Sequence, residues 1–246
     1  MPVLAEKIMK NYFVLVAIAA IFCVTNGGLL DDEAKILTDF KEKYNNSQSD
    51  IIFLMDVSGS VSNYGFASEK IFVDNMLNEF SLAPYSTRVA IITFGYQVKT
   101  DLNYIDIDPT SKTHQKCEFK PRFDHNVVHR YGRATNMKEA FQRSTDLLQT
   151  AINNNHRRSS IHTVAILITD GYWNNGDPRA NANVLKSTYG VDLIAVGVDG
   201  YSQWQLEALA SSLDHVLKYE SFTKFRELAL YIRGGKTNTS TLNSIR

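Results

Sequence analysis

Apolar and polar positions alternate along the chain between short continuous runs and helical spacings. Four continuous apolar runs, rich in β-branched residues, have the length of strands that are buried on both faces: Ile51–Met55, Val89–Phe94, Val164–Thr169 and Leu193–Val198. In four other segments the apolar residues recur at helical spacing: Phe66–Phe80, Met137–Ile152, Trp204–Leu213 and Phe222–Ile232. Strands that alternate with helices predict an α/β fold, in which a mainly parallel sheet carries helices on both faces.

A further short segment adds a fifth strand to the predicted sheet. Val98–Leu102 follows the second apolar run closely, which favours a short antiparallel strand at the edge of the sheet. With 246 residues and 44% apolar content, the chain can form one substantial core, and we expect one domain over residues 50–234. Its 26 basic and 26 acidic residues balance, so composition gives no general attraction for nucleic acid.

The ends of the chain have a different character from this domain. Lys7 and Lys10 precede an apolar run, Tyr12–Val24, that is shorter than the roughly 20 residues of a membrane-spanning helix, and small residues follow it. This pattern predicts a secretory signal peptide over residues 1–27 and an extracellular protein, with an uncleaved signal anchor as the alternative. Residues 28–49 are expected to form a short helix and a linker, and residues 235–246 a flexible tail.

Secretion changes the meaning of the cysteines. Cys23 lies in the predicted signal peptide, so the mature chain would carry Cys117 alone. An unpaired cysteine in an oxidising compartment predicts an intermolecular disulfide, and hence a disulfide-linked homodimer, while a buried inert thiol is the alternative. Two Asn-x-Ser/Thr sites, at Asn45 and Asn238, predict a glycoprotein.

Polar side chains follow the first and third apolar runs where a parallel sheet would bind ligands. Asp56, Ser58 and Ser60 follow the first run, and Asp170 follows the third. Residues two apart in an extended segment face the same side, so the first three could present oxygens in one direction. An all-oxygen array suits a hard divalent cation such as magnesium, whereas the His and Cys ligands of zinc are missing from these loops. A turn that merely caps the next helix is the alternative.

These residues carry a resemblance to a known family. The stretch DVSGS at Asp56–Ser60, with Thr135 in YGRATNMKEAF and Asp170 in ILITDGYW, resembles the metal-ion-dependent adhesion site of the von Willebrand factor type A domain. The order of strands and helices from Asp50 to about Arg233 is also similar to that Rossmann-like fold. The resemblance implies an Mg²⁺ or Mn²⁺ site. Ser58 and Ser60 would bind the ion directly, Thr135 directly or through water, and the two aspartates directly or through its waters.

The rim of this predicted site departs from the family pattern. Arg133 and Ala134 stand where the family often has glycines, and Met137 replaces a common second threonine. Tyr172 and Trp173 follow Asp170 after Gly171, and aromatic side chains there are candidates for ligand contact, together with Arg133. The alternative for the two aromatics is that they fold inward and pack under the loop.

The resemblance also implies a function. A Glu or Asp of a partner would displace water from the ion, so we expect a secreted adhesion or extracellular-matrix protein whose partner is collagen or another matrix protein. In relatives the last helix can shift when the site is occupied, and Phe222–Arg233 would be that helix here. The alternative is a structural matrix building block that assembles through Cys117 or the amino-terminal helix, with the metal site incidental.

The remaining charged and titratable groups change this picture little. The segment Ser111–Arg133 is locally basic and would attract an acidic peptide, a sulfated glycan or a mineral surface, although a solvated face is the alternative. His125 and His129 have a zinc-binding spacing only if a helix spans both, which Val127 and Val128 disfavour. Neither a GxSxG nor a GxxxxGK[ST] motif occurs in the sequence, so we expect a binding protein rather than an enzyme.

Overall fold

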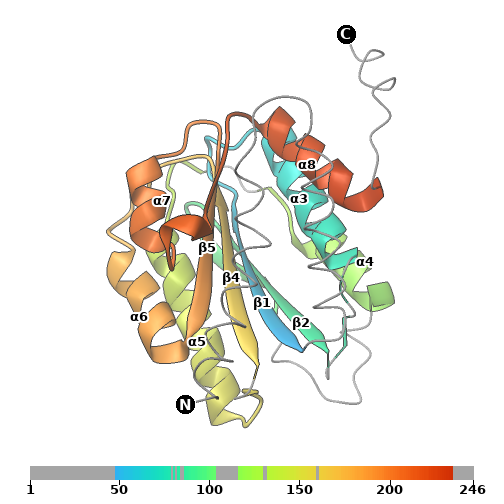
Figure 1. Ribbon diagram of the computed structural model, residues 1–246, viewed down its shortest axis with the longest axis vertical. Helices are drawn as coiled ribbons and strands as arrows, with labels where there is room; N and C mark the ends of the chain where they lie inside the picture. The colour runs from blue at the N-terminus through green and yellow to red at the C-terminus, as the bar shows by residue number, and fades with distance from the viewer. Residues whose placement is uncertain are drawn as a thin grey trace.

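The computed structural model describes residues 48–78, 80, 82–83, 86–103, 116–129, 132–158 and 161–234. Six strands form one sheet in the order β3-β2-β1-β4-β5-β6 (Figure 1). Their bounds are β1 Ser49–Asp56, β2 Thr87–Phe94, β3 Val98–Leu102, β4 His162–Thr169, β5 Val191–Val198 and β6 Val216–Tyr219. Only the β2–β3 pair in this sheet is antiparallel, which confirms the predicted mainly parallel sheet with an antiparallel edge strand.

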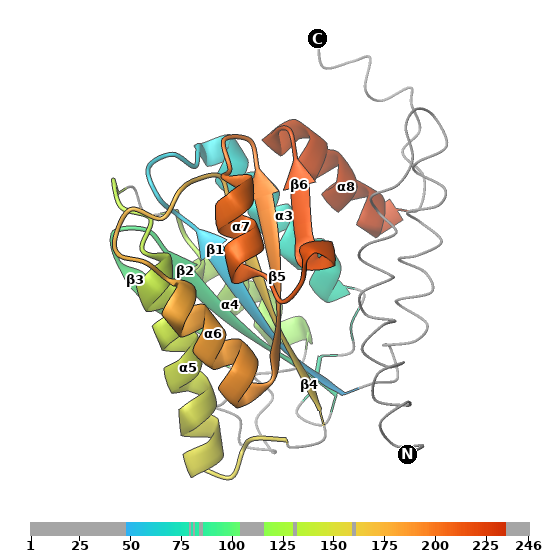
Figure 2. The same ribbon diagram turned by 60° about the vertical axis from the view of Figure 1, so that its left-hand side comes forward.

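Helices cover both faces of the sheet, as Figures 1 and 2 show. One face carries α3 (Asn63–Asn78), α4 (Lys116–Asn126) and α8 (Phe222–Gly234). The other face carries α5 (Met137–Asn153), α6 (Arg179–Tyr189) and α7 (Gln203–Leu209), and a short 3₁₀ helix spans Leu213–His215. Among the described residues, no helix is both long and apolar enough to cross a membrane.

The alternation of side chains along β1 explains why its sequence is apolar at every position from Ile51 to Met55. Ile51, Phe53 and Met55 point into the core cluster under α3, α4 and α8, whereas Ile52 and Leu54 point into the cluster under α5, α6 and α7. Every residue of β1 is buried. A central strand covered on both faces therefore reads as a continuous hydrophobic run rather than as an alternating one.

Helix boundaries follow from capping groups that the apolar pattern does not reveal. The helix predicted from Phe66 begins at Asn63, where the hydroxyl of Ser62 accepts a hydrogen bond from the Gly65 backbone N–H at 3.0 Å. At α5, Asn136 Oδ1 accepts from Glu139 N at 3.2 Å, and Asn136 Nδ2 donates to Glu139 Oε2 at 2.9 Å. The first bond satisfies a free backbone N–H at the helix start, and the second holds the two side chains together. The predicted Trp204–Leu213 helix ends earlier, at Leu209.

Three elements were absent from the prediction because their sequences carry weak patterns. Helix α4 is polar and contains Pro121. Helix α6 has just two fully buried residues, Ala182 and Leu185. Strand β6 has just four residues. In each case neighbouring elements supply contacts that the segment's own periodicity does not show.

The predicted last helix forms, as α8, and it lies along α3. A Cβ built at Gly65 would come within 2.9 Å of the Phe222 ring, so this position of α3 must remain small. Further along the two helices, the Phe72 and Phe225 ring centroids are 4.8 Å apart. Asn75 Nδ2 donates a hydrogen bond of 2.5 Å to the Ala229 carbonyl. Close approach and a buried polar bond together set the position of α8.

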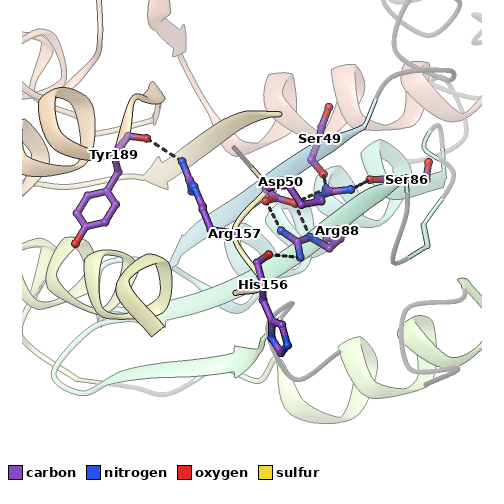
Figure 3. Close-up of polar contacts among 8 residues, drawn as sticks. Ser49, Asp50, Ser86, Arg88, His156, Arg157 and Tyr189 are labelled. Carbon is purple, nitrogen blue, oxygen red and sulfur yellow. Dashed lines mark hydrogen bonds and ion pairs between the residues drawn. The ribbon is translucent and has the colours of Figure 1, made fainter. Parts of the chain in front are cut away.

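A buried ionic cluster holds the amino-terminal ends of the strands together (Figure 3). The carboxylate of Asp50 on β1 is fully buried and accepts hydrogen bonds from Arg88 Nε at 2.7 Å and Arg88 Nη2 at 2.5 Å. Arg158 Nη2 donates to the same carboxylate at 2.5 Å. Arg158 also donates to the carbonyls of Ser49 and Ser86, and Arg88 to that of His156. One carboxylate thus connects β1, β2 and the segment before β4.

Replacing Asp50 with asparagine should destabilise the protein strongly. The change leaves two guanidinium groups without their anion in a buried place, and loss of one partner of a buried ion pair costs about 3 kcal/mol or more. Urea unfolding should show a lower midpoint with an unchanged slope. Asp192→Asn is the matched control, because Asp192 is partly exposed at the start of β5 and has no ion pair with a described residue. Equal stability of the two variants would contradict the assigned role of the cluster.

Candidate metal centre

Asp56 is the last residue of β1, and its carboxylate is fully buried. Its Oδ1 accepts a hydrogen bond from the Ser58 backbone N–H at 2.8 Å, and its Oδ2 accepts one from Thr169 Oγ1 at 2.6 Å. Thr169 ends β4, the neighbouring strand. Both oxygens are therefore held by groups at the carboxyl ends of two adjacent parallel strands, and the orientation of the carboxylate is set by the sheet itself.

Two serines connect the first loop to the second aspartate. The hydroxyl oxygens of Ser58 and Ser60 are 3.0 Å apart, and Ser60 Oγ donates a hydrogen bond of 2.8 Å to Asp170 Oδ1. Ser58 is buried, and Asp170 is 8% exposed. The predicted convergence of Asp56, Ser58, Ser60 and Asp170 therefore occurs, although 110 residues separate Ser60 from Asp170.

Thr135 reaches the same place on a loop that hydrogen bonds hold from two sides. The Gly59 backbone N–H donates to the Gly132 carbonyl, and a Cβ built at Gly59 would lie 2.6 Å from that oxygen. On the other side, Asn174 Oδ1 accepts from Thr135 N at 2.8 Å, and Asn174 Nδ2 donates to the Arg133 carbonyl at 3.3 Å. Asn174 was not predicted, because nothing in the NNG sequence indicates which loop it contacts.

These groups surround one cavity of about 510 Å³. Gly171 lies beside two of the hydroxyls, because a Cβ built there would be in ordinary contact with Ser60 Oγ at 3.6 Å and Thr135 Oγ1 at 4.0 Å. Asp56 lies beneath the cavity, hydrogen-bonded to Ser58. The lining comprises four predicted metal ligands, two predicted rim residues and four further residues: Ser58, Ser60, Thr135, Asp170, Arg133, Tyr172, Gly59, Gly171, Asn174 and Gly200.

The electrostatics of the site indicate a deficit of positive charge. Burial raises the pKa of Asp56 to about 7, and hydrogen bonds from Ser58 and Thr169 oppose this rise only in part. Burial also raises the pKa of Asp170, against the hydrogen bond from Ser60. One carboxyl group is thus fully buried and the other largely buried, with neutral hydroxyls as neighbours. Such a site favours a cation.

The donor set fits a hard divalent ion. All the polar side chains that would face the ion present oxygen, which magnesium and manganese prefer, and no His or Cys lines the cavity among the described residues. In the described part of the chain, no three His, Cys, Asp or Glu side chains cluster as a metal site. An ion held by two aspartates would therefore depend on the hydroxyls of Ser58, Ser60 and Thr135. That dependence matches the ligand set that the resemblance implies.

Glu69 is a third acidic group near the site, and sequence reasoning did not identify it. It lies on α3, is fully buried, and neither of its carboxylate oxygens has a hydrogen-bond partner among the described residues. Burial raises its pKa well above the usual range, and the charges of Asp56 and Asp170 raise it further. The helical pattern of α3 places position 69 on the side of the helix that faces the core. An acidic residue at such a position was therefore the sequence signal that could have identified Glu69.

The two aromatic rim candidates occupy different environments. Tyr172 lines the cavity and is 56% exposed. Trp173 is partly buried against the core cluster under α5, α6 and α7, and its ring lies edge-on to Trp204 with centroids 5.4 Å apart. The Trp173 backbone N–H donates to Gln205 Oε1 at 3.1 Å. Tyr172 is therefore placed for ligand contact, and Trp173 anchors the loop on α7.

The histidine pair does not share a helix. His125 lies in α4, which ends at Asn126, whereas His129 lies beyond it. The His129 ring stacks on Phe66 with centroids 5.1 Å apart, and its Nδ1 is 3.1 Å from Asn63 Oδ1.

Some of the residues predicted from the sequence to be modified or cross-linked lie outside the described part of the structure. Cys117 is the second residue of α4, but its side chain, Asn45 and Asn238 fall outside the described part of the structure, so the disulfide and the glycans stay predictions. In the basic segment, Lys120 makes ion pairs with Asp74 at 2.9 Å and Asp124 at 3.1 Å. This part of the segment is therefore locally neutralised.

The family model for the von Willebrand factor type A domain matches residues 50–229. The chain belongs to this family. Its sheet order, its helices on both faces and the position of its DVSGS loop at the carboxyl end of β1 are those expected from the resemblance.

The chain spans only a small part of the length of the curated relatives that it matches. The chain is 35% identical over 185 residues to the sushi, von Willebrand factor type A, EGF and pentraxin domain-containing protein 1 of Mus musculus, covering 73% of this chain and 5% of that protein. It is 28% identical to matrilin-1 of Gallus gallus over 73% of this chain and 35% of that protein. Proximal thread matrix protein 1 from the mussel byssus is similar in structure, with a TM-score of 0.64, 25% identity, and coverage of 76% of this chain and 47% of that one. Another structure of the mussel protein is 22% identical to this chain and shares its fold. In that structure the metal-ion-dependent adhesion site (MIDAS) motif is occupied by zinc.

Without divalent metal, the stability of the protein should fall as pH rises from about 4 to about 7. The folded state holds a proton on Asp56 up to a pKa of about 7, whereas the unfolded chain loses it near 3.8, so the stabilisation is present at low pH and lost as pH rises. Asp56→Asn removes the contribution of this carboxyl group to the pH dependence, while the contributions of Asp170 and Glu69 remain. In EDTA the variant should be the more stable protein at pH 8, by up to about 4 kcal/mol, and much closer to wild type at pH 5.

Thermal unfolding in EDTA and in magnesium, at both pH values, checks this expectation. Magnesium should reverse the order at pH 8, because only the wild type retains both carboxylates. A difference between the two proteins that did not change with pH would contradict it.

Replacing Glu69 with methionine should stabilise the metal-free protein. Methionine has a similar length and an adaptable apolar side chain. The change removes a buried acid that has no hydrogen-bond partner among the described residues, which is worth about 1–3 kcal/mol. Urea unfolding in EDTA at pH 7 measures the effect. Asp74→Asn on the same helix is the control, since that carboxylate is partly exposed and paired with Lys120, and its loss should matter by less than about 1 kcal/mol. Destabilisation by Glu69→Met would mean that the carboxyl group has a stabilising partner.

Proposed function

We propose that this protein binds one divalent cation, magnesium or manganese, and uses it to capture an acidic side chain of an extracellular-matrix protein. Asp56, Ser58, Ser60, Thr135 and Asp170 would hold the ion. The ion would supply a coordination position that is open to a carboxylate of the partner. The role proposed is adhesion or matrix binding in the extracellular space.

One observation carries this proposal: the continuous contact from buried Asp56 through Ser58 and Ser60 to Asp170. The link from Asp56 Oδ1 to Ser58 N is 2.8 Å, the serine hydroxyls are 3.0 Å apart, and Ser60 Oγ to Asp170 Oδ1 is 2.8 Å. Oxygen donors already grouped in this way need little rearrangement to surround a small cation. In the structure these groups hydrogen-bond to one another.

Charge explains why the partner would be acidic. The two aspartates formally balance a divalent ion, and the other donors are neutral hydroxyls, so the ion remains attractive to an additional anion. Two exposed residues, Tyr172 and Arg133, line the cavity. A glutamate or aspartate side chain can enter this cavity, whereas a neutral side chain gains no comparable interaction with the ion.

The relatives support the matrix setting. Proximal thread matrix protein 1 is named as a matrix protein of the mussel byssus, and one of its structures has a zinc-occupied MIDAS motif. A collagen chain, collagen alpha-5(VI) of Homo sapiens, is also similar to this chain. Collagen or another matrix protein is accordingly the proposed partner. An enzymatic role has less support, because no histidine that could act as a general base lines the cavity among the described residues.

Isothermal titration of the protein with magnesium and with manganese tests the cation site. The expected result is saturable binding of one ion, lost in Asp56→Ala and in Ser58→Ala, because one variant removes a carboxylate and the other a hydroxyl ligand. Asp192→Asn is the matched control, because Asp192 lies at the start of β5, at the opposite end of the strand from the site, and makes no ion pair with a described residue.

A solid-phase assay then tests the adhesive role, with collagen VI and with matrilin-1 as probes. Binding should require magnesium or manganese and disappear with chelator and in Asp56→Ala. Binding or assembly that survives both treatments would refute metal-bridged capture. It would support a structural building block that assembles through Cys117 or the amino-terminal segment.

A further inference from the structure

Arg133 differs from the other residues of the cavity because it carries a positive charge. It is exposed and lines the same cavity as Ser58, Ser60 and Asp170. Within the described residues, its guanidinium makes no hydrogen bond and no ion pair. The other charged residue of the lining, Asp170, accepts a hydrogen bond from Ser60 within the candidate metal site. The cavity therefore offers an available cationic group beside the cation site.

The backbone that carries Arg133 is held in place by both neighbouring loops. The Gly132 carbonyl accepts a hydrogen bond from Gly59 of the first loop, and the Arg133 carbonyl accepts one from Asn174 of the loop after β4. Asn174 also accepts from the Thr135 backbone N–H at 2.8 Å. The backbone position of the arginine relative to the metal ligands is thus set before any partner arrives. A fixed backbone loses less conformational freedom on binding than a mobile loop would.

The chemistry of the side chain indicates what it would bind. A guanidinium presents a rigid fork of donors that matches a carboxylate, and such charge-assisted pairs are among the stronger hydrogen bonds. A carboxylate bound at the metal would engage the ion. Arg133 would remain free for another anionic group of the same ligand, and the exposed Tyr172 ring offers apolar contact in the same cavity.

We propose that the ligand segment is an acidic peptide with two carboxylate side chains, one for the ion and one for Arg133. This inference rests on the proposed function, which supplies the first carboxylate. In an extended peptide, side chains two residues apart face the same side at a spacing of roughly 7 Å, which suits two neighbouring subsites of one cavity of about 510 Å³. Adjacent acidic residues face opposite sides and could not occupy both subsites at once.

Three capped heptapeptides test the proposal in magnesium by NMR titration of the protein. The first has glutamate at positions three and five, the second at positions three and four, and the third at position three alone, with glycine elsewhere. The first should bind about tenfold more tightly than the third, the gain expected for one charge-assisted pair. In Arg133→Gln this advantage should disappear, so that the first and third peptides bind with the same affinity.

Two further variants separate a specific pair from general attraction. Lys138→Gln removes an exposed positive charge from the start of α5, next to a neighbouring cavity, and should leave the tenfold advantage intact. Arg133→Lys keeps the charge without the fork and should retain only part of it.

The outcomes distinguish this inference from the proposed function. If the single-glutamate peptide binds with magnesium but the second glutamate adds nothing, the two-carboxylate inference is wrong and metal-bridged capture stands. The inference also fails if the adjacent-glutamate peptide binds as well as the first, or if Lys138→Gln weakens binding as much as Arg133→Gln. If no peptide binds more tightly with magnesium than with EDTA, the proposed function itself is refuted.

Discussion

The complete burial of the Asp56 carboxylate is the constraint on which the rest of the site depends. A carboxylate at the end of a central strand needs hydrogen bonds or a cation, because the core around it offers no water. The backbone of Ser58 and the hydroxyl of Thr169 supply two bonds and thereby fix the paths of the loops after β1 and β4. They do not remove the need for positive charge, as the raised pKa of Asp56 indicates. The site is thus arranged around an unmet electrostatic requirement.

The order of the strands places the other groups near this carboxylate. β1 lies between β2 and β4, and Met55 is opposite Ile168 in the register, so Asp56 follows on beside Thr169 and close to Asp170. The segment before α5 then closes over the DVSGS loop through Gly59 and Gly132, whose close approach excludes a side chain at Gly59. At the opposite end of the same strand, Asp50 holds two arginines. The central strand therefore carries a buried acid near each end, one neutralised by the protein and one available for a cation.

Much of the fold could be predicted because its signals are local. Buried parallel strands are continuous apolar runs, and α5 combines a clear helical spacing with a capping residue at Asn136. The elements that escaped prediction, α4, α6 and β6, have short or polar sequences whose conformation depends on neighbours. The five candidate metal ligands were identifiable for a similar reason, since three belong to one contiguous motif and the other two directly follow or precede recognisable elements. Asn174 and Glu69 were not, because their importance lies in contacts and burial rather than in a sequence pattern.

The sequence by itself determined the alternation of strands and helices, the family and the residue types of the candidate site, because hydrophobic periodicity and a contiguous motif are properties of neighbouring residues. Only the tertiary structure decided which distant groups meet. Ser60 hydrogen-bonds to Asp170, Thr169 to Asp56, and Asn174 to the loop that carries Thr135. Tyr172 is exposed while its neighbour Trp173 packs inward. Glu69 is buried without a hydrogen-bond partner among the described residues. Such contacts depend on the register of the sheet and on the loops above it, where a shift of one residue turns a side chain to the other face.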